Sequence, residues 1–197
     1  MIEIFFPTKD RNSELRKCIE SILNYHTDIK VTIANCSNDY EETSKILRDY
    51  PVKEVLLNPD PGMNESFNVL ISQLSQPLSL WLSDDVVLKR PLDTAIDYLN
   101  SNQIDILGIP FIDNIHYTDI NWPVDQYGCA NWIENGRRVG HFAICKTDIL
   151  KTVTLQRETI DTQIFILFGR NRYEFFESEA FIVHDRYMDE TRKNRKI

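Results

Sequence analysis

The chain has 197 residues, of which 42% are hydrophobic and 26% are charged, and its formal net charge is −8. This length and composition are those of a globular chain with a substantial core, and they favour one domain. The negative charge argues against non-specific binding to nucleic acid or to an anionic membrane.

Neither a membrane span nor an export signal is expected. No run approaches eighteen apolar residues, and the opening "MIEIFFPTKD" has an early acidic residue and only a short apolar stretch. The cysteines at 18, 36, 129 and 145 lack CxxC spacing, which is typical of reduced thiols. We therefore expect a cytoplasmic protein. The last six residues, "RKNRKI", hold four basic groups, and we interpret them as a solvated tail, with phosphate or lipid contact as the alternative.

Strands and helices alternate through the first half of the chain. Strands are predicted at 2–6, 30–34, 52–57 and 78–83, and helices at 12–25, about 41–50 and 64–74. The strands are nearly continuous apolar runs, as expected when helices cover both faces of a sheet. The alternation predicts an α/β fold with a doubly wound, mostly parallel sheet.

The second half is less regular. Here the predicted elements are a helix at 92–100, a strand at 104–111, an irregular stretch at 112–138, a strand at 139–145, a short helix at 146–153, a longer helix near 158–170, and strands at 173–176 and 181–184. No repeat, low-complexity segment or linker divides the chain. The sequence therefore predicts a single compact domain.

Four polar clusters follow predicted strands, at 8–11, 35–39, 58–64 and 83–85. In open α/β sheets, ligands bind outside the carboxyl ends of the strands. We therefore expect these clusters to outline one crevice.

Asp84 and Asp85 are the sharpest feature, because two adjacent carboxylates end an apolar strand. Such a pair repels itself unless a cation or hydrogen-bond donors compensate. Mg²⁺ or Mn²⁺ would compensate the pair and bridge to phosphates of a ligand. The alternative is a purely structural pair, with Asp84 capping a turn and Asp85 bound to a basic side chain. The position after a core strand favours the metal.

Two further candidates lie late in the chain. His184 ends the apolar run "AFIV", where a neutral imidazole would supply a metal ligand or a donor to phosphate. Asp161 lies near the start of the helix at 158–170, where it would complement the helix dipole or serve as a general base. His26, His116 and His141 are interpreted as structural or surface residues.

The ordered motifs resemble the family-2 type of nucleotide-sugar-dependent glycosyltransferases with the GT-A fold. The resemblance is carried by "FFPTKDR…LRKCIESIL", "VTIANCSND", "PGMNESFNVLIS", "LWLSDDV" and "IDTQIF". It implies a metal-dependent, inverting transfer from a nucleoside-diphosphate sugar to an acceptor hydroxyl. It also divides the domain into a nucleotide-sugar-binding half at 1–110, an acceptor and catalytic half at 111–185, and a basic tail at 186–197.

The resemblance also implies roles for individual residues. Asp85 and His184 would ligate Mn²⁺ or Mg²⁺, and Asp161 would deprotonate the acceptor. Residues implied in donor binding are Pro7, Thr8, Lys9, Arg11, Asn35, Asn64, Asn68 and Asp84. The acceptor is left open as a glycan, a lipid-linked sugar, a protein or a modified nucleic-acid base.

Two alternative functions are judged from positions where the sequence departs from the motifs of related families. A nucleotidyltransferase usually has a glycine-rich basic loop after the first strand, whereas "FPTKDRNSE" contains no glycine. A non-catalytic nucleotide- or sugar-binding module of the same fold stays open because Ala34 and Asn35 stand where the family has an acidic pair.

Overall fold

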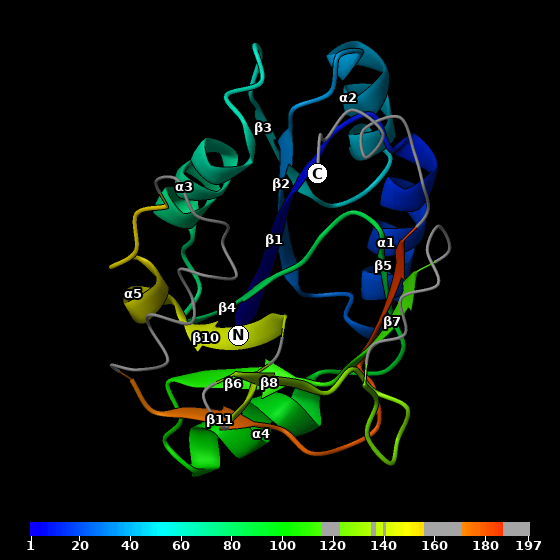
Figure 1. Cartoon of the computed structure of the whole chain (residues 1–197). Helices are drawn as coiled ribbons and strands as arrows, with labels where there is room; N and C mark the ends of the chain where they lie inside the picture. The colour runs from blue at the N-terminus through cyan, green and yellow to red at the C-terminus, as the bar shows by residue number, and fades with distance from the viewer. Residues whose placement is uncertain (116–122, 135–136, 140, 156–170, 187–197) are drawn as a thin grey trace.

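The central element of the computed structural model is a seven-stranded sheet in the order β11-β6-β10-β4-β1-β2-β3 (Figure 1). The structure describes residues 1–115, 123–134, 137–139, 141–155 and 171–186. The strands of the sheet are β1 (Ile2–Thr8), β2 (Lys30–Asn35), β3 (Lys53–Leu56), β4 (Leu78–Trp81), β6 (Ile106–Ile109), β10 (Phe142–Lys146) and β11 (Tyr173–Phe175).

Most strands of this sheet are parallel, as the sequence predicts. β1 pairs in parallel with both β2 and β4, and β2 pairs in parallel with β3. β10 lies between β4 and β6 and runs antiparallel to both, while β11 returns parallel to β6. The α/β fold with a mixed, mostly parallel sheet is therefore confirmed.

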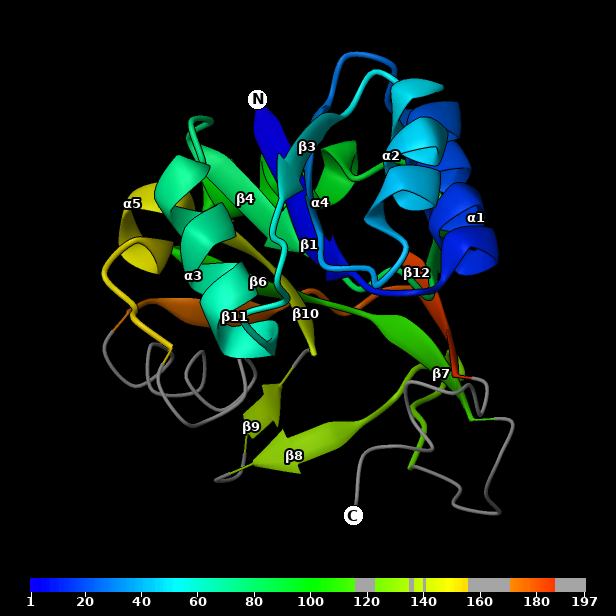
Figure 2. The same ribbon diagram turned by 90° about the horizontal axis from the view of Figure 1, so that it is seen from above.

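Helices cover both faces of the sheet (Figure 2). They are α1 (Asn12–Tyr25), α2 (Tyr40–Arg48), α3 (Met63–Gln73), α4 (Asp93–Ser101) and α5 (Thr147–Leu150). Because side chains alternate along a strand, Ile4 and Phe6 of β1 pack with the core under α1, α2 and α4. Phe5 points to the other face and meets Phe67 of α3 edge-on, with ring centroids 6.1 Å apart.

A second, three-stranded sheet has the order β5-β12-β7, formed by β5 (Val86–Leu88), β12 (Ile182–Arg186) and β7 (Phe111–Ile115). The single strand predicted at 104–111 is wrong in one respect, because it is split at Pro110 into β6 and β7 of different sheets. Proline has no N–H for a ladder, so a break there is expected. Three-residue β5 and the hairpin of β8 (Trp132–Glu134) and β9 (Arg137–Val139) were not predicted.

Some predictions fall outside the residues that the structure describes. These are His116, the helix near 158–170 with Asp161, and residues 187–197 of the basic tail. Within the described ranges, every helix is too short or too polar to cross a membrane.

Candidate functional site

The polar segments after β1, β2 and β4 meet at one edge of the central sheet. The parallel register places Thr8, the last residue of β1, beside Asn35, the last residue of β2. On the other side of β1, the backbone N–H of Leu82 donates to the carbonyl of Phe5, so the segment of Asp84 leaves β4 beside the end of β1. The expected convergence is observed for the ends of these three strands, and the crevice that the four clusters are expected to outline stays a prediction.

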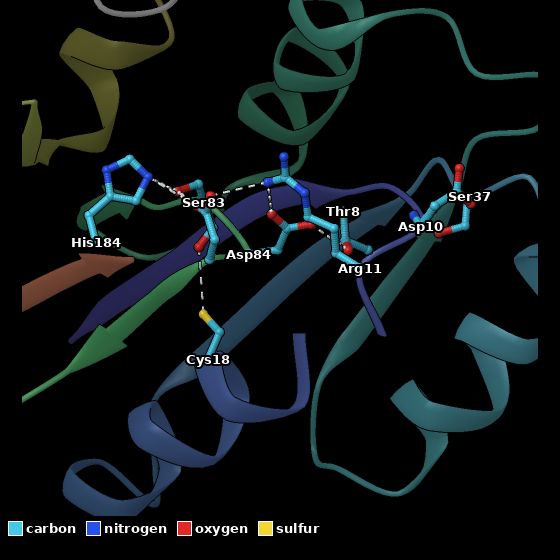
Figure 3. A network of polar contacts seen from close by, with 9 residues as sticks. Thr8, Asp10, Arg11, Cys18, Ser37, Ser83, Asp84 and His184 are labelled. Atoms are coloured by element: carbon cyan, nitrogen blue, oxygen red, sulfur yellow. Dashed lines mark hydrogen bonds and ion pairs between the residues drawn. The ribbon is translucent and has the colours of Figure 1, made fainter. Parts of the chain in front are cut away.

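Asp84 is buried and held by two residues from the end of β1 and its loop (Figure 3). The Thr8 hydroxyl donates to Asp84 Oδ2 at 2.8 Å, and Arg11 Nη1 donates to Asp84 Oδ1 at 3.0 Å. Hydrogen bonds to an ionised acceptor are stronger than neutral ones. The structure thus brings Thr8, Arg11 and Asp84 together, three of the residues expected around a donor.

Asp85 is also buried, and it lies in the segment that joins β4 of the central sheet to β5 of the smaller sheet. Its Oδ2 is 3.2 Å from the same Arg11 Nη1 that binds Asp84. Its Oδ1 accepts from the Ser83 hydroxyl at 2.6 Å and lies 3.1 Å from His184 Nε2. The predicted pairing of Asp85 with His184 in space is therefore observed.

The smaller sheet positions His184. β12 lies between β5 and β7, and the register sets His184 opposite Val86 on one side and Asp113 on the other. Val86 directly follows Asp85, so this register brings the imidazole to the carboxylate. The second ring nitrogen, Nδ1, is 3.3 Å from Asp113 Oδ1.

Asp113 was not identified from the sequence. Its side chain is almost fully buried, and a carboxylate at the second nitrogen of a metal-binding histidine commonly fixes the orientation of the ring. The only signal in the sequence is one acidic residue just after the apolar run 104–111. Its pairing with a histidine 71 positions later depends on the order of strands in the smaller sheet.

Aromatic rings further confine His184. The His141 ring stacks on it with centroids 5.6 Å apart and an interplanar angle of 11°. The Phe142 ring meets it edge-on at 5.5 Å. His141, interpreted from the sequence as structural or surface, is therefore a packing neighbour of the candidate metal ligand.

The two adjacent carboxyl groups have opposite pKa shifts. Burial raises the pKa of Asp84 to about 6, because it outweighs the attraction of Arg11 and is reinforced by the charge of Asp85. Burial also opposes ionisation of Asp85, but the interactions with His184, Ser83 and Arg11 outweigh it and hold the pKa of Asp85 below its usual range. Asp85 is thus the more firmly ionised of the two.

The residues around Asp85 fit a divalent metal as a partial ligand set. Among the residues that the structure describes, no three His, Cys, Asp or Glu side chains converge as a complete site. However, the 3.1 Å between Asp85 Oδ1 and His184 Nε2 matches two neighbouring ligands of an octahedral ion with bonds of about 2.1 Å. Mg²⁺ is usually bound by one or two protein groups together with phosphates and water.

Other predicted donor residues lie in the loops after β1 and β3. Lys9 Nζ forms an exposed ion pair of 2.7 Å with Asp60 Oδ2, which links these two loops. The Asp10 carboxylate accepts from the backbone N–H of Asn38 at 2.8 Å, which links the loop after β1 to that after β2. Pro7 lies within β1 beside these loops.

The asparagines predicted to contact a donor differ in their surroundings. Asn35 is buried, and its amide nitrogen donates to Glu54 Oε1 at 2.7 Å. Asn68 in α3 donates to the carbonyl of Leu155 and accepts from its N–H, each at 2.8 Å. Asn64 lies half-buried in the first turn of α3. Donor contacts of these residues stay predictions, and the amides of Asn35 and Asn68 join separate segments of the protein.

Comparison of the sequence with protein-family models and with curated proteins finds no match. Solved structures do match. TarS from S. aureus in complex with UDP-GlcNAc superposes with a TM-score of 0.71 at 14% identity, over 100% of this chain and 61% of TarS. The chain therefore spans about three fifths of the TarS structure that it matches.

Two other structures match over most of both chains. HddC from Yersinia pseudotuberculosis has a TM-score of 0.60 at 9% identity, covering 93% of each chain. CMP:2-keto-3-deoxy-manno-octonic acid synthetase complexed with CTP has a TM-score of 0.58 at 12% identity, covering 91% of this chain and 90% of that one. At these identities the likeness shows the fold, which is the fold common to GT-A and nucleotidyltransferase-like structures. The GT-A fold expected from the sequence motifs is confirmed.

Proposed function

We propose that this protein is a metal-dependent glycosyltransferase that moves a sugar from a nucleoside-diphosphate sugar to an acceptor hydroxyl with inversion. The observation that carries the proposal is the meeting of Asp84, Asp85 and His184 at the carboxyl edge of the central strands. In α/β sheets this edge is where ligands bind. The fold match to TarS in complex with UDP-GlcNAc supports the choice of donor class.

In this proposal, Asp85 and His184 hold Mn²⁺ or Mg²⁺, with Ser83 and Asp113 orienting them. The bound ion would supply charge neutralisation for the diphosphate leaving group. Asp84 faces the donor ribose or the metal, and the residues around β1 and its loop line the nucleoside. These residues are Pro7, Thr8, Lys9 and Arg11, and the guanidinium of Arg11, beside both aspartates, would face the diphosphate end of the donor.

The proposed acceptor chemistry is a single displacement at the anomeric carbon. Asp161 would take the proton from the acceptor hydroxyl as that oxygen attacks. This role rests on the resemblance of "IDTQIF" to the base-containing motif, since Asp161 lies outside the described residues. The acceptor is proposed as a glycan, a lipid-linked sugar, a protein or a modified nucleic-acid base.

Thermal unfolding with a panel of nucleoside diphosphates and nucleotide sugars tests donor binding. A ligand that binds only the folded state raises its stability, and a concentration of one hundred times Kd adds about 2.7 kcal/mol. We expect at least one nucleotide to raise Tm, and to raise it more with Mn²⁺ than without. Absence of any shift across the panel would reject the proposed donor site.

Two variants then test the metal site and the catalytic base separately. Asp85→Ala is expected to abolish the Mn²⁺-dependent shift, whereas the matched control Asp97→Ala, on the exposed side of α4, is expected to keep it. Asp161→Asn is expected to bind donor normally and to lose sugar transfer. Full turnover in Asp161→Asn would remove it as the base.

A second candidate function is nucleotidyl transfer, favoured by the matches to HddC and to the CTP complex over about nine tenths of both chains. Incubation with a nucleoside triphosphate and a sugar phosphate would release pyrophosphate under this alternative. Release of nucleoside diphosphate from a nucleotide sugar supports the glycosyltransferase instead. A non-catalytic module would bind nucleotide and release neither product.

A further inference from the structure

One guanidinium nitrogen occupies the position between the two site carboxylates. Arg11 Nη1 is 3.0 Å from Asp84 Oδ1 (Figure 3). The same nitrogen is 3.2 Å from Asp85 Oδ2. The Arg11 side chain is only 11% exposed, and both aspartates are less exposed still. Two buried neighbouring carboxylates require a compensating positive charge. In this structure, Arg11 supplies that charge.

A divalent ion and the guanidinium compete for these oxygens. A metal bound to a carboxylate lies about 2.1 Å from its oxygen, so it cannot share the position of Nη1 between Asp84 and Asp85. An ion held instead on the other side of Asp85, by Oδ1 and His184 Nε2, would still have the positive guanidinium on Oδ2 of the same carboxylate. In either place, the guanidinium weakens the attraction of the aspartates for the ion.

The backbone at Arg11 is anchored, because its carbonyl accepts from the N–H of Leu15 at 2.9 Å and the preceding residue, Asp10, is held as well. The N–H of Asp10 donates to the Ser37 hydroxyl at 3.1 Å, and the Asp10 carboxylate holds the N–H of Asn38. Asp10 has a φ of 55°, a left-handed conformation that aspartate tolerates better than most residues. A change of partner by Arg11 therefore requires rotation of its side chain and no displacement of the loop.

We propose that Arg11 occupies the cation position of the Asp84–Asp85 pair until a nucleoside diphosphate arrives, and that the diphosphate then becomes its partner. The inference rests on the proposed function, because the diphosphate is that of the donor. The planar guanidinium binds phosphate oxygens through paired N–H donors. The consequence is coupled binding, in which metal alone binds weakly and metal with diphosphate binds tightly.

Titration calorimetry with Mn²⁺ on the full chain tests this exchange. Arg11→Met removes the charge but keeps an unbranched side chain, and Arg11→Gln removes the charge but keeps an N–H donor for Asp84. The matched control is Arg16→Met, which removes an exposed arginine of α1 that pairs with Asp49 at 3.6 Å. Circular dichroism establishes that each variant is folded, and Arg11→Gln replaces Arg11→Met if the latter is not.

We expect the Arg11 variant to bind Mn²⁺ alone about tenfold or more tightly than wild type, because a unit charge a few ångströms away opposes a divalent ion even in high dielectric. Arg16→Met is expected to bind like wild type. With saturating uridine diphosphate, the Mn²⁺ affinity of wild type should rise at least about fivefold, the lower end of measured coupling between sites, and the rise should shrink in the Arg11 variant.

The outcomes separate this inference from the proposed function. Unchanged Mn²⁺ affinity in a folded Arg11 variant overturns the inference, even if uridine diphosphate binds wild type. If instead the Arg11 variant binds Mn²⁺ alone more tightly but no nucleoside diphosphate changes the Mn²⁺ affinity of wild type or variant, Arg11 lies at the cation position. That result rejects the proposed donor site and the exchange of partner.

Discussion

Thr8 provides a direct measure of how strongly the buried Asp84 depends on its neighbours. The Thr8 side chain is 2% exposed, and its hydroxyl donates to Asp84 Oδ2 at 2.8 Å. Thr8→Val keeps the shape and removes only this hydrogen bond. A hydrogen bond to a charged group contributes about 1.5–3 kcal/mol, so we expect the free energy of unfolding to fall by about 2 kcal/mol. For a chain of this length, that corresponds to a Tm lower by about 5 °C.

The matched control is Thr43→Val. Thr43 is also buried, but its hydroxyl donates to the neutral amide oxygen of Asn12 at 2.9 Å. A neutral hydrogen bond contributes about 0.5–1.5 kcal/mol, so the expected loss is about half as large. Urea unfolding at pH 7.5 measures the free energy of unfolding of each variant, and the comparison with wild type requires equal m-values in all three proteins. Equal losses, or no loss in Thr8→Val, would refute the reasoning that Thr8 stabilises an ionised Asp84.

Three other changes have defined expected outcomes. Asp113→Asn should weaken Mn²⁺ binding about 10–100-fold, the usual effect of losing a partner of a metal-binding histidine. The Tm of the variant without metal measures how much Asp113 contributes to stability. Unchanged Mn²⁺ affinity in calorimetry would exclude the orienting role of Asp113. Burial disfavours the Glu3 carboxylate, but donors from Ser75, Thr32 and Lys30 outweigh it and hold its pKa below the ordinary 4.5, so its stabilisation is present above pH 4.5 and declines as pH falls through the lower folded pKa. Glu3→Gln should accordingly be about 1–3 kcal/mol less stable at pH 7, and it should lose less stability between pH 4.5 and 3 than wild type. Urea unfolding at each pH measures both, and parallel plots of the free energy of unfolding against pH for the two proteins would contradict the prediction. Asn68→Ala should cost about 1–3 kcal/mol because it leaves the backbone groups at position 155 without their amide partner, and an unchanged urea midpoint would show that water replaces it.

The central sheet was predictable because its signals are local. β1, β2 and β4 are short, mostly apolar runs separated by amphipathic segments, and each pattern depends only on neighbouring residues. The Asp84–Asp85 pair was identifiable for the same reason, since two carboxylates interrupt an apolar run within one short stretch. The position of Thr8 and Arg11 near this pair followed from the rule that loops after parallel strands share an edge.

The smaller sheet was not predictable in the same way. β5 has only three residues, and β7 continues an apolar run that is divided at Pro110. Neither segment carries a pattern that shows which strand pairs with it. Asp113 therefore could not be linked to His184 before the parallel register of β7 and β12 was known.

The sequence by itself determined the α/β alternation, the sheet edge that bears the polar residues and the aspartate pair, because hydrophobic periodicity and strand polarity act over short distances along the chain. Only the tertiary structure decided that Arg11 bridges both carboxylates and that His184 lies between Asp85 and Asp113. Those contacts join residues that are 71 to 99 positions apart in the sequence. Strand order and side-chain burial set them, and both depend on the packing of the whole domain.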